Sequence, residues 1–417
     1  HAPEKQMTSP QAYEVGAAGA YVVTGASAAF NTLAAGTAAD SFTFSRATNT
    51  SSDSLTFIGL TAATTTALTA AGEETLTLKS SSTGQAVITD ITDAALTTLL
   101  ITGTGGVTVT NALTGTTALA TITDSHTGTG TLTVDASNST TAITFTSGAA
   151  TGTTTLTTGS GNDVVTAGAG ILSATLGTGN DSATGGTLND SIDGGAGNDT
   201  INGGDGADSL TGGSGADSIT GGEGIDRIIT GGGTDTVNLT ETTSAVDTVV
   251  VAGDGVVNVD TVTGFTVGSD VIEVTIGAFV GTSTATLSTA GGVDVGALAA
   301  GAFTTESVAA GVATANTAAT NAIFLSSTAY STFANAVNGE GTGTYAVTDV
   351  GFTNEGVLTV WYDASHSQAV IGMWVDDEQT VTANKLNTSD TFVEIVRVGM
   401  TSTDYTLANI DALLSAA

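Results

Sequence analysis

The sequence contains no cysteine, two prolines and only six lysine and arginine residues in 417 positions. The absence of cysteine excludes a disulfide framework, although an exported protein that is held together by metal ions does not need one. The six basic residues stand against 40 acidic ones, and the net charge of −34 excludes a basic surface for nucleic acid or for anionic membranes. No run of 18 apolar residues occurs, so we expect no transmembrane span.

Residues for catalysis are also scarce. The three histidines are His1, His126 and His366, and no H-E-x-x-H pattern is present, which excludes a zinc protease of that type. A G-x-S-x-G nucleophile elbow is missing as well, which excludes a typical lipase. Asp363, Ser365 and His366 are so close in sequence that they cannot easily form a triad. We therefore expect no enzymatic activity, and we place His126 at the surface of a turn.

What the sequence does contain is a repeat of great regularity. Nine consecutive nine-residue blocks run from Thr158 to Asn238 without an insertion or a deletion, and the clearest copies read GGAGNDTIN, GGDGADSLT and GGSGADSIT. The eighth position is apolar or alanine in every block, and the sixth position is aspartate in all but one. The sixth-position aspartates are Asp163, Asp181, Asp190, Asp199, Asp208, Asp217, Asp226 and Asp235.

The spacing of the blocks predicts a metal site. The glycine-rich half of a block can turn with positive φ, and the other half forms a short strand whose eighth residue faces inward. Two blocks complete one coil, so the sixth position recurs on the same edge every 18 residues, with coils ~4.8 Å apart. Two carboxylates and several turn carbonyls can then surround one cation. Oxygen donors without cysteine or a nearby histidine favour Ca²⁺ over Mg²⁺ or Zn²⁺.

Pairing neighbouring aspartates along each edge gives about six calcium ions. One block, AGAGILSAT, has Leu172 where the aspartate is expected, so Asp190 begins its edge without an upstream carboxylate partner. Stacked like charges repel one another, and a glycine-rich backbone loses much entropy when it becomes ordered. We therefore predict that this segment is disordered without calcium and folds as it binds the metal.

This repeat resembles the G-G-x-G-x-D-x-U-x motif of the RTX (repeats-in-toxin) calcium-binding β-roll family. Residues 247–274 resemble the segment that closes many RTX rolls, and there the resemblance implies that Asp270 ligates a further ion. The stretches 358–376 and 392–414 resemble the hairpin and closing strand near RTX C-termini, with Asp363 opening the hairpin turn. The resemblance also implies export through a type I channel. The matches to the closing pattern are Asp247, Asp260, Phe265, Gly268, Asp270 and Ile272.

The predicted fold is all-β, a right-handed parallel β-helix or β-roll solenoid with calcium-binding turns and a β-rich C-terminal cap. Residues 1–39 form an N-terminal cap or a subunit-joining segment, and 40–157 an irregular β-helix, for which a β-sandwich stays open. Residues 158–246 form the calcium roll, and 247–417 the cap with a C-terminal secretion and assembly domain. Alanine- and threonine-rich 309–322 and 331–337 are compatible with short helices. The aromatic cluster Trp361, Tyr362, Met373 and Trp374 is interpreted as core.

The composition as a whole is similar to that of RTX-type bacterial S-layer proteins. This similarity implies a non-enzymatic, extracellular structural protein that folds with calcium and self-assembles into a cell-surface layer or filament. Its expected partners are copies of itself, with lipopolysaccharide or another surface glycan as a candidate anchor, and no nucleic acid. The alternative is a secreted adhesin in which the roll is a spacer. The chain starts at His1 without a basic-apolar signal peptide, so we expect either a processed or trimmed product or a chain that is not exported through the general secretory route.

Overall fold

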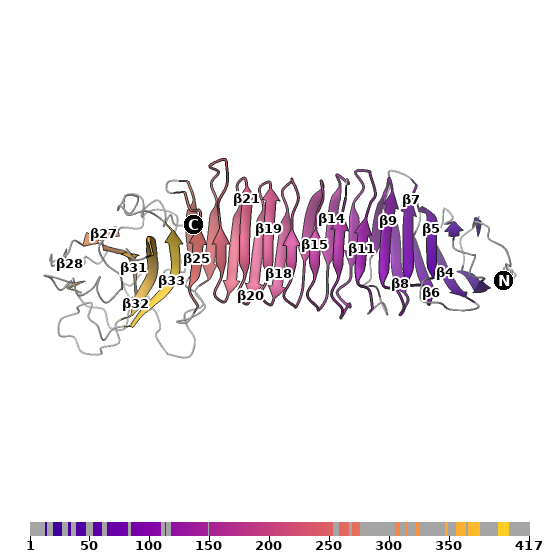
Figure 1. Cartoon of the computed structure of the whole chain (residues 1–417), viewed down its shortest axis with the longest axis horizontal. Coiled ribbons are helices and arrows are strands. Elements are labelled where there is room, and N and C mark those ends of the chain that lie inside the picture. Colours follow the sequence, from indigo (N-terminus) through magenta and orange to yellow (C-terminus); the bar gives the residue numbers. More distant parts are fainter. Residues whose placement is uncertain are drawn as a thin grey trace. The chain divides into compact units, whose positions relative to one another are not determined.

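The computed structural model describes residues 53–275 with short gaps at 61–64, 82–84, 110–112, 114–117, 149, 253–257 and 267–268. Outside that range it describes only strands and the turn residues 366–367. All regular secondary structure among the described residues is β-strand (Figure 1). The chain divides into two compact units, His1–Thr211 and Gly212–Ala417.

The first unit is a parallel solenoid in which the chain passes alternately through two sheets. Each strand pairs with the next strand but one, so one sheet collects the odd-numbered strands and the other collects the even-numbered ones (Figure 1). The odd-numbered strands are β1 (Tyr13–Glu14), β3 (Thr32–Ala34), β5 (Ser54–Leu60), β7 (Thr75–Ser80), β9 (Thr98–Gly103), β11 (Thr121–Asp124), β13 (Thr144–Ser147), β15 (Val164–Thr166), β17 (Ser182–Thr184) and β19 (Thr200–Asp205). The even-numbered strands are β2 (Ala20–Ala26), β4 (Ala39–Arg46), β6 (Thr65–Ala71), β8 (Gln85–Thr92), β10 (Gly106–Val109), β12 (Leu132–Asp135), β14 (Thr153–Thr157), β16 (Ile171–Thr175) and β18 (Ser191–Ala196).

The length of a coil shortens along this unit. Leu76 pairs with Leu99, Leu99 with Ile122 and Ile122 with Phe145, each partner being 23 residues farther on. Val165 pairs with Ala183 and Ala183 with Ile201, now 18 residues apart. The longer coils carry longer turns between strands of similar length, because the strand ladder fixes the rise per coil but not the loop length.

The core of the first unit is a stack of inward-facing apolar side chains. Strands alternate between buried and more exposed positions, as in β7, where Leu76 and Leu78 are buried and Lys79 is exposed. Large residues fill the longer coils, with Phe44, Phe57 and Phe145 among the largest fully buried side chains. In the shorter coils one residue per strand suffices, such as Ile192 and Ile201. The core is therefore narrow within the nonapeptide coils.

The second unit continues the same architecture and adds an antiparallel sheet. Its solenoid strands are β21 (Ser218–Glu223), β22 (Arg227–Gly232), β23 (Thr236–Asn238), β24 (Thr248–Ala252), β25 (Asp260–Thr263) and β26 (Val271–Thr275), and β20 (Ser209–Ser214) crosses the division between the units. The C-terminal strands are β27 (Thr305–Val308), β28 (Thr314–Ala315), β29 (Ala322–Leu325), β30 (Val347–Thr348), β31 (Gly356–Asp363), β32 (Gln368–Val375) and β33 (Thr391–Gly399).

Strand β33 covers the solenoid edge that β25 would otherwise expose. It pairs with β25 in parallel, Val262 opposite Val398, and with β32 in antiparallel, while β32 pairs with β31 as a hairpin. An exposed strand edge is a template for unwanted pairing, and the antiparallel sheet removes that edge from β25. The hairpin turn begins at Asp363, whose carbonyl accepts the amide of His366 and whose carboxylate contacts the same histidine ring.

The predicted fold class is confirmed: the described chain is all-β, and its coils form a parallel solenoid. The short-helix interpretation of 309–322 is wrong at Thr314–Ala315, which form strand β28 and pair with β30, while 331–337 lies outside the described residues. The placement of His126 at the surface is also wrong, since the residue is 1% exposed. A hydrogen bond between its ring and Asp124 inside the turn compensates the cost of burying it. The division into four segments stays a prediction. No helix in the described part of the chain is long and apolar enough to span a membrane.

Candidate metal centre

The predicted aspartates all lie at the end of a glycine-rich turn, one residue before a solenoid strand. In the turn that leads to Asp199, Gly195 and Gly197 have φ values of 93° and 135°, a region that residues with a Cβ rarely adopt. The side chain after such a turn is directed inward, and Asp199 is only 1% exposed. The remaining predicted ligands, including Asp270, are buried in the same way.

In the first unit these carboxylates form two ladders with the backbone. Along one edge, Oδ1 of Asp163, Asp181 and Asp199 accepts the amide of Ile143, Asp163 and Asp181, at 2.7, 2.7 and 2.8 Å. Along the other edge, Oδ1 of Asp190 accepts the amide of Leu172 and Oδ1 of Asp208 accepts that of Asp190, both at 2.7 Å. Each aspartate thus binds the amide one coil earlier. Leu172 removes a carboxylate from the second ladder but leaves the amide in place.

In the second unit the ladders run on beyond the nonapeptides. Oδ1 of Asp235 accepts the amide of Asp217 at 2.8 Å, and Oδ1 of Asp260 accepts that of Asp235 at 2.9 Å. The other edge continues when Asp247 accepts the amide of Asp226 at 2.9 Å, and Asp270 that of Asp247 at 3.1 Å.

Asp247 and Asp260 were not among the predicted ligands, because insertions move them 21 and 25 residues from their partners. A short sequence pattern around each of them could have identified them as ladder members. Each begins an Asp-Thr-Val triplet in which the valine is buried, like the last residues of a nonapeptide.

The second oxygen of these carboxylates is placed to bind a cation. Oδ2 of Asp163 and Oδ2 of Asp181 are both buried, and Oδ2 of Asp181 has no hydrogen-bond partner. A buried carboxylate oxygen without a partner is costly, and a bound cation removes that cost. The corresponding oxygen is likewise buried in Asp199, Asp208, Asp217, Asp226 and Asp235.

Asp190 and Asp270 differ from the other rungs. Their Oδ2 atoms accept a hydrogen bond from a backbone amide four residues earlier, that of Gly186 at 2.6 Å and that of Thr266 at 2.7 Å. Their second oxygen is thus already satisfied within the turn. Asp190 follows the coil that has Leu172, and Asp270 lies beyond the nonapeptides.

Glycine at the start of these turns leaves space for carboxylate and carbonyl oxygens, because it has no side chain. A Cβ built on Gly212 or Gly221 would lie 2.5 Å from Oδ2 of Asp217 or Asp226, which is too close. The same hypothetical atom on Gly212 would lie 2.5 Å from the carbonyl oxygen of Thr230. Carboxylate and carbonyl oxygens therefore line one turn. No three His, Cys, Asp or Glu side chains converge among the described residues, so further donors have to be backbone oxygens. This oxygen-only donor set fits calcium.

Burial raises the pKa of the ladder carboxylates, because it disfavours a negative charge that no neighbouring cationic side chain among the described residues offsets. It raises the pKa of Asp181 and the pKa of Asp208 to about 6, with smaller contributions from neighbouring carboxylates. For Asp247, burial and then the charges of Asp226, Asp270 and Glu241 raise the pKa to about 7. Burial also raises the pKa of Asp163, Asp190, Asp199 and Asp270.

These shifts predict that acid partly replaces calcium. A folded carboxyl group with a raised pKa holds its proton more tightly than the unfolded one, so the stability of the calcium-free roll falls as pH rises from about 3.8 to about 6. In excess chelator we expect more β-signal by circular dichroism near pH 4.5 than near pH 7.5. With calcium present the order reverses, because protons compete for the same oxygens. A chelated protein whose signal is flat over this window would contradict the prediction.

Comparison with known proteins gives one match. Residues 149–170, 175–210 and 211–240 match the family model described as RTX calcium-binding nonapeptide repeat (4 copies). No curated protein and no solved structure matches the chain.

Proposed function

Because this chain carries the RTX calcium-binding nonapeptide repeat, whose copies bind Ca²⁺ and are characteristic of secreted extracellular proteins, we propose that it is a non-enzymatic structural protein. It assembles with calcium into a layer or filament on the cell surface after export by a type I system. The observation that carries the proposal is the ladder of buried carboxylates, which recurs in coil after coil of each unit. The carboxylates of these coils bind backbone amides of the adjacent coil, as in a scaffold whose repeats contact only their neighbours.

The ions are proposed to lie between neighbouring rungs. In the first unit these rungs pair Asp163 with Asp181, Asp181 with Asp199 and Asp190 with Asp208. In the second unit they pair Asp217 with Asp235 and Asp226 with Asp247, and the ladder continues to Asp260 and Asp270. This set extends the estimate of about six ions beyond the nonapeptides. Calcium supplies positive charge there, and the carboxylates hold it without further chemistry.

Calcium also makes contact between copies feasible. Copies of a chain with a net charge of −34 repel one another at neutral pH. Each bound divalent ion offsets two of those charges, so copies of the protein that have bound calcium repel one another less than copies of the calcium-free chain. The adhesin alternative receives no support from Tyr362, which is buried in the C-terminal hairpin rather than displayed.

Negative-stain microscopy of the full chain tests the assembly. We expect ordered sheets or filaments in millimolar calcium, their loss after addition of chelator, and none in an equal concentration of magnesium. Analytical ultracentrifugation of the same samples gives the mass distribution. A monodisperse monomer at high protein and calcium concentration would contradict self-assembly and would favour the adhesin, for which glycan binding is then measured.

A further inference from the structure

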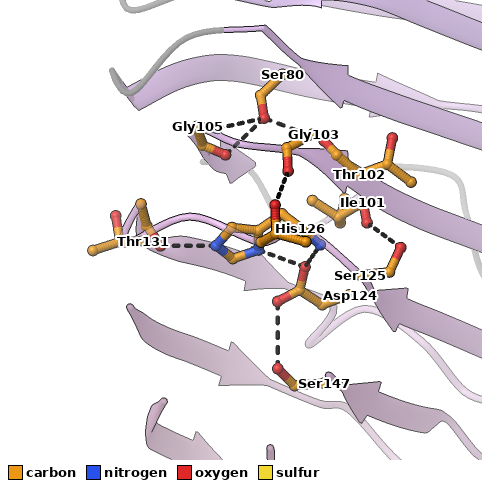
Figure 2. A network of polar contacts seen from close by, with 12 residues as sticks. Ser80, Ile101, Thr102, Gly103, Gly105, Asp124, Ser125, His126, Thr131 and Ser147 are labelled. Carbon is orange, nitrogen blue, oxygen red and sulfur yellow. Dashed lines mark hydrogen bonds and ion pairs between the residues drawn. The ribbon is translucent and has the colours of Figure 1, made fainter. Parts of the chain in front are cut away.

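The turn that follows β11 contains a buried pair of ionisable side chains far from the aspartate ladders. Asp124 is the last residue of β11, and His126 lies two residues later; their side chains are 0% and 2% exposed. Histidine Nδ1 lies 2.6 Å from Oδ1 of Asp124, and Nε2 lies 3.0 Å from the carbonyl oxygen of Gly130. Figure 2 shows the ring between the aspartate and the backbone beside Thr131.

The partners of the ring determine how many protons it holds. An ionised carboxylate and a carbonyl oxygen only accept hydrogen bonds, so each ring nitrogen that faces one of them needs a proton. Either neutral tautomer would place a nitrogen lone pair against an oxygen lone pair. The amide of His126 also donates to Oδ1 of Asp124 at 3.1 Å, and Ser147 Oγ donates to Oδ2 at 3.4 Å. The carboxylate therefore has donors on both oxygens, as an ionised group prefers.

This turn lies on the edge where the roll carries its second carboxylate ladder. Asp124 pairs with Ser147, and the neighbouring column runs from Thr146 through Thr166 to Thr184, immediately before the turn that contains Asp190. The positions that correspond to Asp190 in the earlier coils are Leu132, Thr154 and Leu172, none of which has a carboxylate.

We propose that His126 is held as an imidazolium, a built-in cation that fastens this turn in a coil without ladder carboxylates, and that the turn loosens when the ring loses its proton. This upstream turn would thereby be held by a proton, whereas the turns of the roll are proposed to be held by calcium. The inference concerns a different part of the chain and does not depend on the proposed assembly.

The electrostatic surroundings agree with a bound proton. The hydrogen bond to Asp124 raises the pKa of His126, and burial opposes that shift without cancelling it. Ser80 two coils earlier, residues 102–105 on the preceding coil and Ser147 on the following coil are uncharged (Figure 2). Among the described groups that act on the ring, Asp124 is the charged one. The stabilisation is therefore complete below the unfolded pKa of 6.5 and is lost as pH rises through the raised folded pKa.

The protonation state can be measured directly on the full chain in saturating calcium. Nitrogen NMR shifts of isotope-labelled histidine distinguish an imidazolium from either neutral tautomer, and the His126→Gln variant assigns the signal among three histidines. We expect the imidazolium pattern at neutral pH, with a titration midpoint above 6.5. A neutral ring at pH 7 in the wild-type protein would overturn the proposal. The decisive measurement is made on the wild-type protein, and the variant serves only to assign the signal.

Local hydrogen exchange tests the fastening role. The amides of Ser125 and Thr127 bind carbonyls of the preceding coil, so their protection reports whether the turn is closed. In the wild-type protein we expect their protection factors, corrected for intrinsic rates, to fall about tenfold or more above the titration midpoint. His126→Gln should show the low protection at all pH values. The control is His366→Gln, which removes a histidine that also contacts an aspartate but is 65% exposed. Equal pH dependence of protection in wild type and His126→Gln would overturn the inference.

Discussion

Chelation of calcium is expected to abolish most of the β-signal of the nonapeptide coils at pH 7.5. In each ladder of the first unit, buried carboxylates follow one another at the spacing of adjacent coils, and Oδ2 of Asp181 has no hydrogen-bond partner in the protein. Two unit charges ~5 Å apart repel by roughly 3 kcal/mol at an effective dielectric of 20. The narrow apolar core, one residue such as Ile192 or Ile201 per strand, offers little to offset several such repulsions.

The measurement is a calcium titration of the full chain from excess chelator, followed by circular dichroism. We expect a steep, reversible gain of β-signal, because each coil is stabilised by its neighbours. Titration with magnesium is the control for ionic strength, since magnesium requires a more rigid octahedral shell. A full β-signal in excess chelator would show that the ladders do not depend on the metal.

A single charge in the ladder tests which oxygens bind the ion. Asp181→Asn keeps an Oδ1 that can accept the amide of Asp163 but removes the charge at Oδ2. Because Asp181 lies between two rungs, the calcium midpoint should rise about tenfold or more, which corresponds to roughly 1.4 kcal/mol. The matched control is Asp193→Asn, which removes one exposed charge from β18 in the same unit. Equal midpoints for the two variants would mean that Asp181 is not a ligand.

The sequence was most informative where its period was strict. Blocks of constant length place the sixth residue of every second block on the same edge and the eighth residue of every block in the core, so the burial of Asp199 and Ile201 follows from counting alone. Upstream, strand-forming apolar pairs occur in both sheets, so their spacing along the sequence indicates strands but does not give the length of a coil. Leu99 and Val107 belong to different sheets, and the true repeat there is 23 residues.

Side-chain partners across loops could not be predicted from the sequence. The pattern ITDSHTGTG looks like an exposed polar turn, and only the fold brings the carbonyl of Gly130 to the ring of His126. Asp247 and Asp260 were missed as ladder members for the same reason, since insertions of variable length hide the register that the strands β24 and β25 restore. Local patterns report strand and turn, whereas the loop length determines which turn lies next to which.

Replacing Gly197 with alanine is expected to destabilise the first unit by about 3–5 kcal/mol, the sum of two local costs. The φ of Gly197 is 135°, which a residue with a Cβ adopts only with strain. A Cβ built there would also overlap the carbonyl of Gly179 on the adjacent coil and would lie 3.1 Å from Asn180 Oδ1. Neither neighbour can retreat, because the amide of Asn198 binds that same Asn180 oxygen at 2.9 Å and the strands hold the coil spacing.

Gly148→Ala provides the matched control for this substitution. A Cβ at Gly148 would meet its nearest neighbour, the carbonyl oxygen of Asp124, at an ordinary 3.5 Å, and the amide of Gly148 keeps its hydrogen bond to that oxygen. Alanine there should be neutral or should stabilise the fold by up to about 1 kcal/mol, since it reduces the entropy of the unfolded chain. Urea unfolding in saturating calcium separates the two variants, and the Gly197 variant should also need more calcium to fold. If both variants unfolded at the wild-type urea concentration, successive turns would not approach each other as closely as described. The proposal that carbonyl and carboxylate oxygens of these turns share one ion would then fail as well.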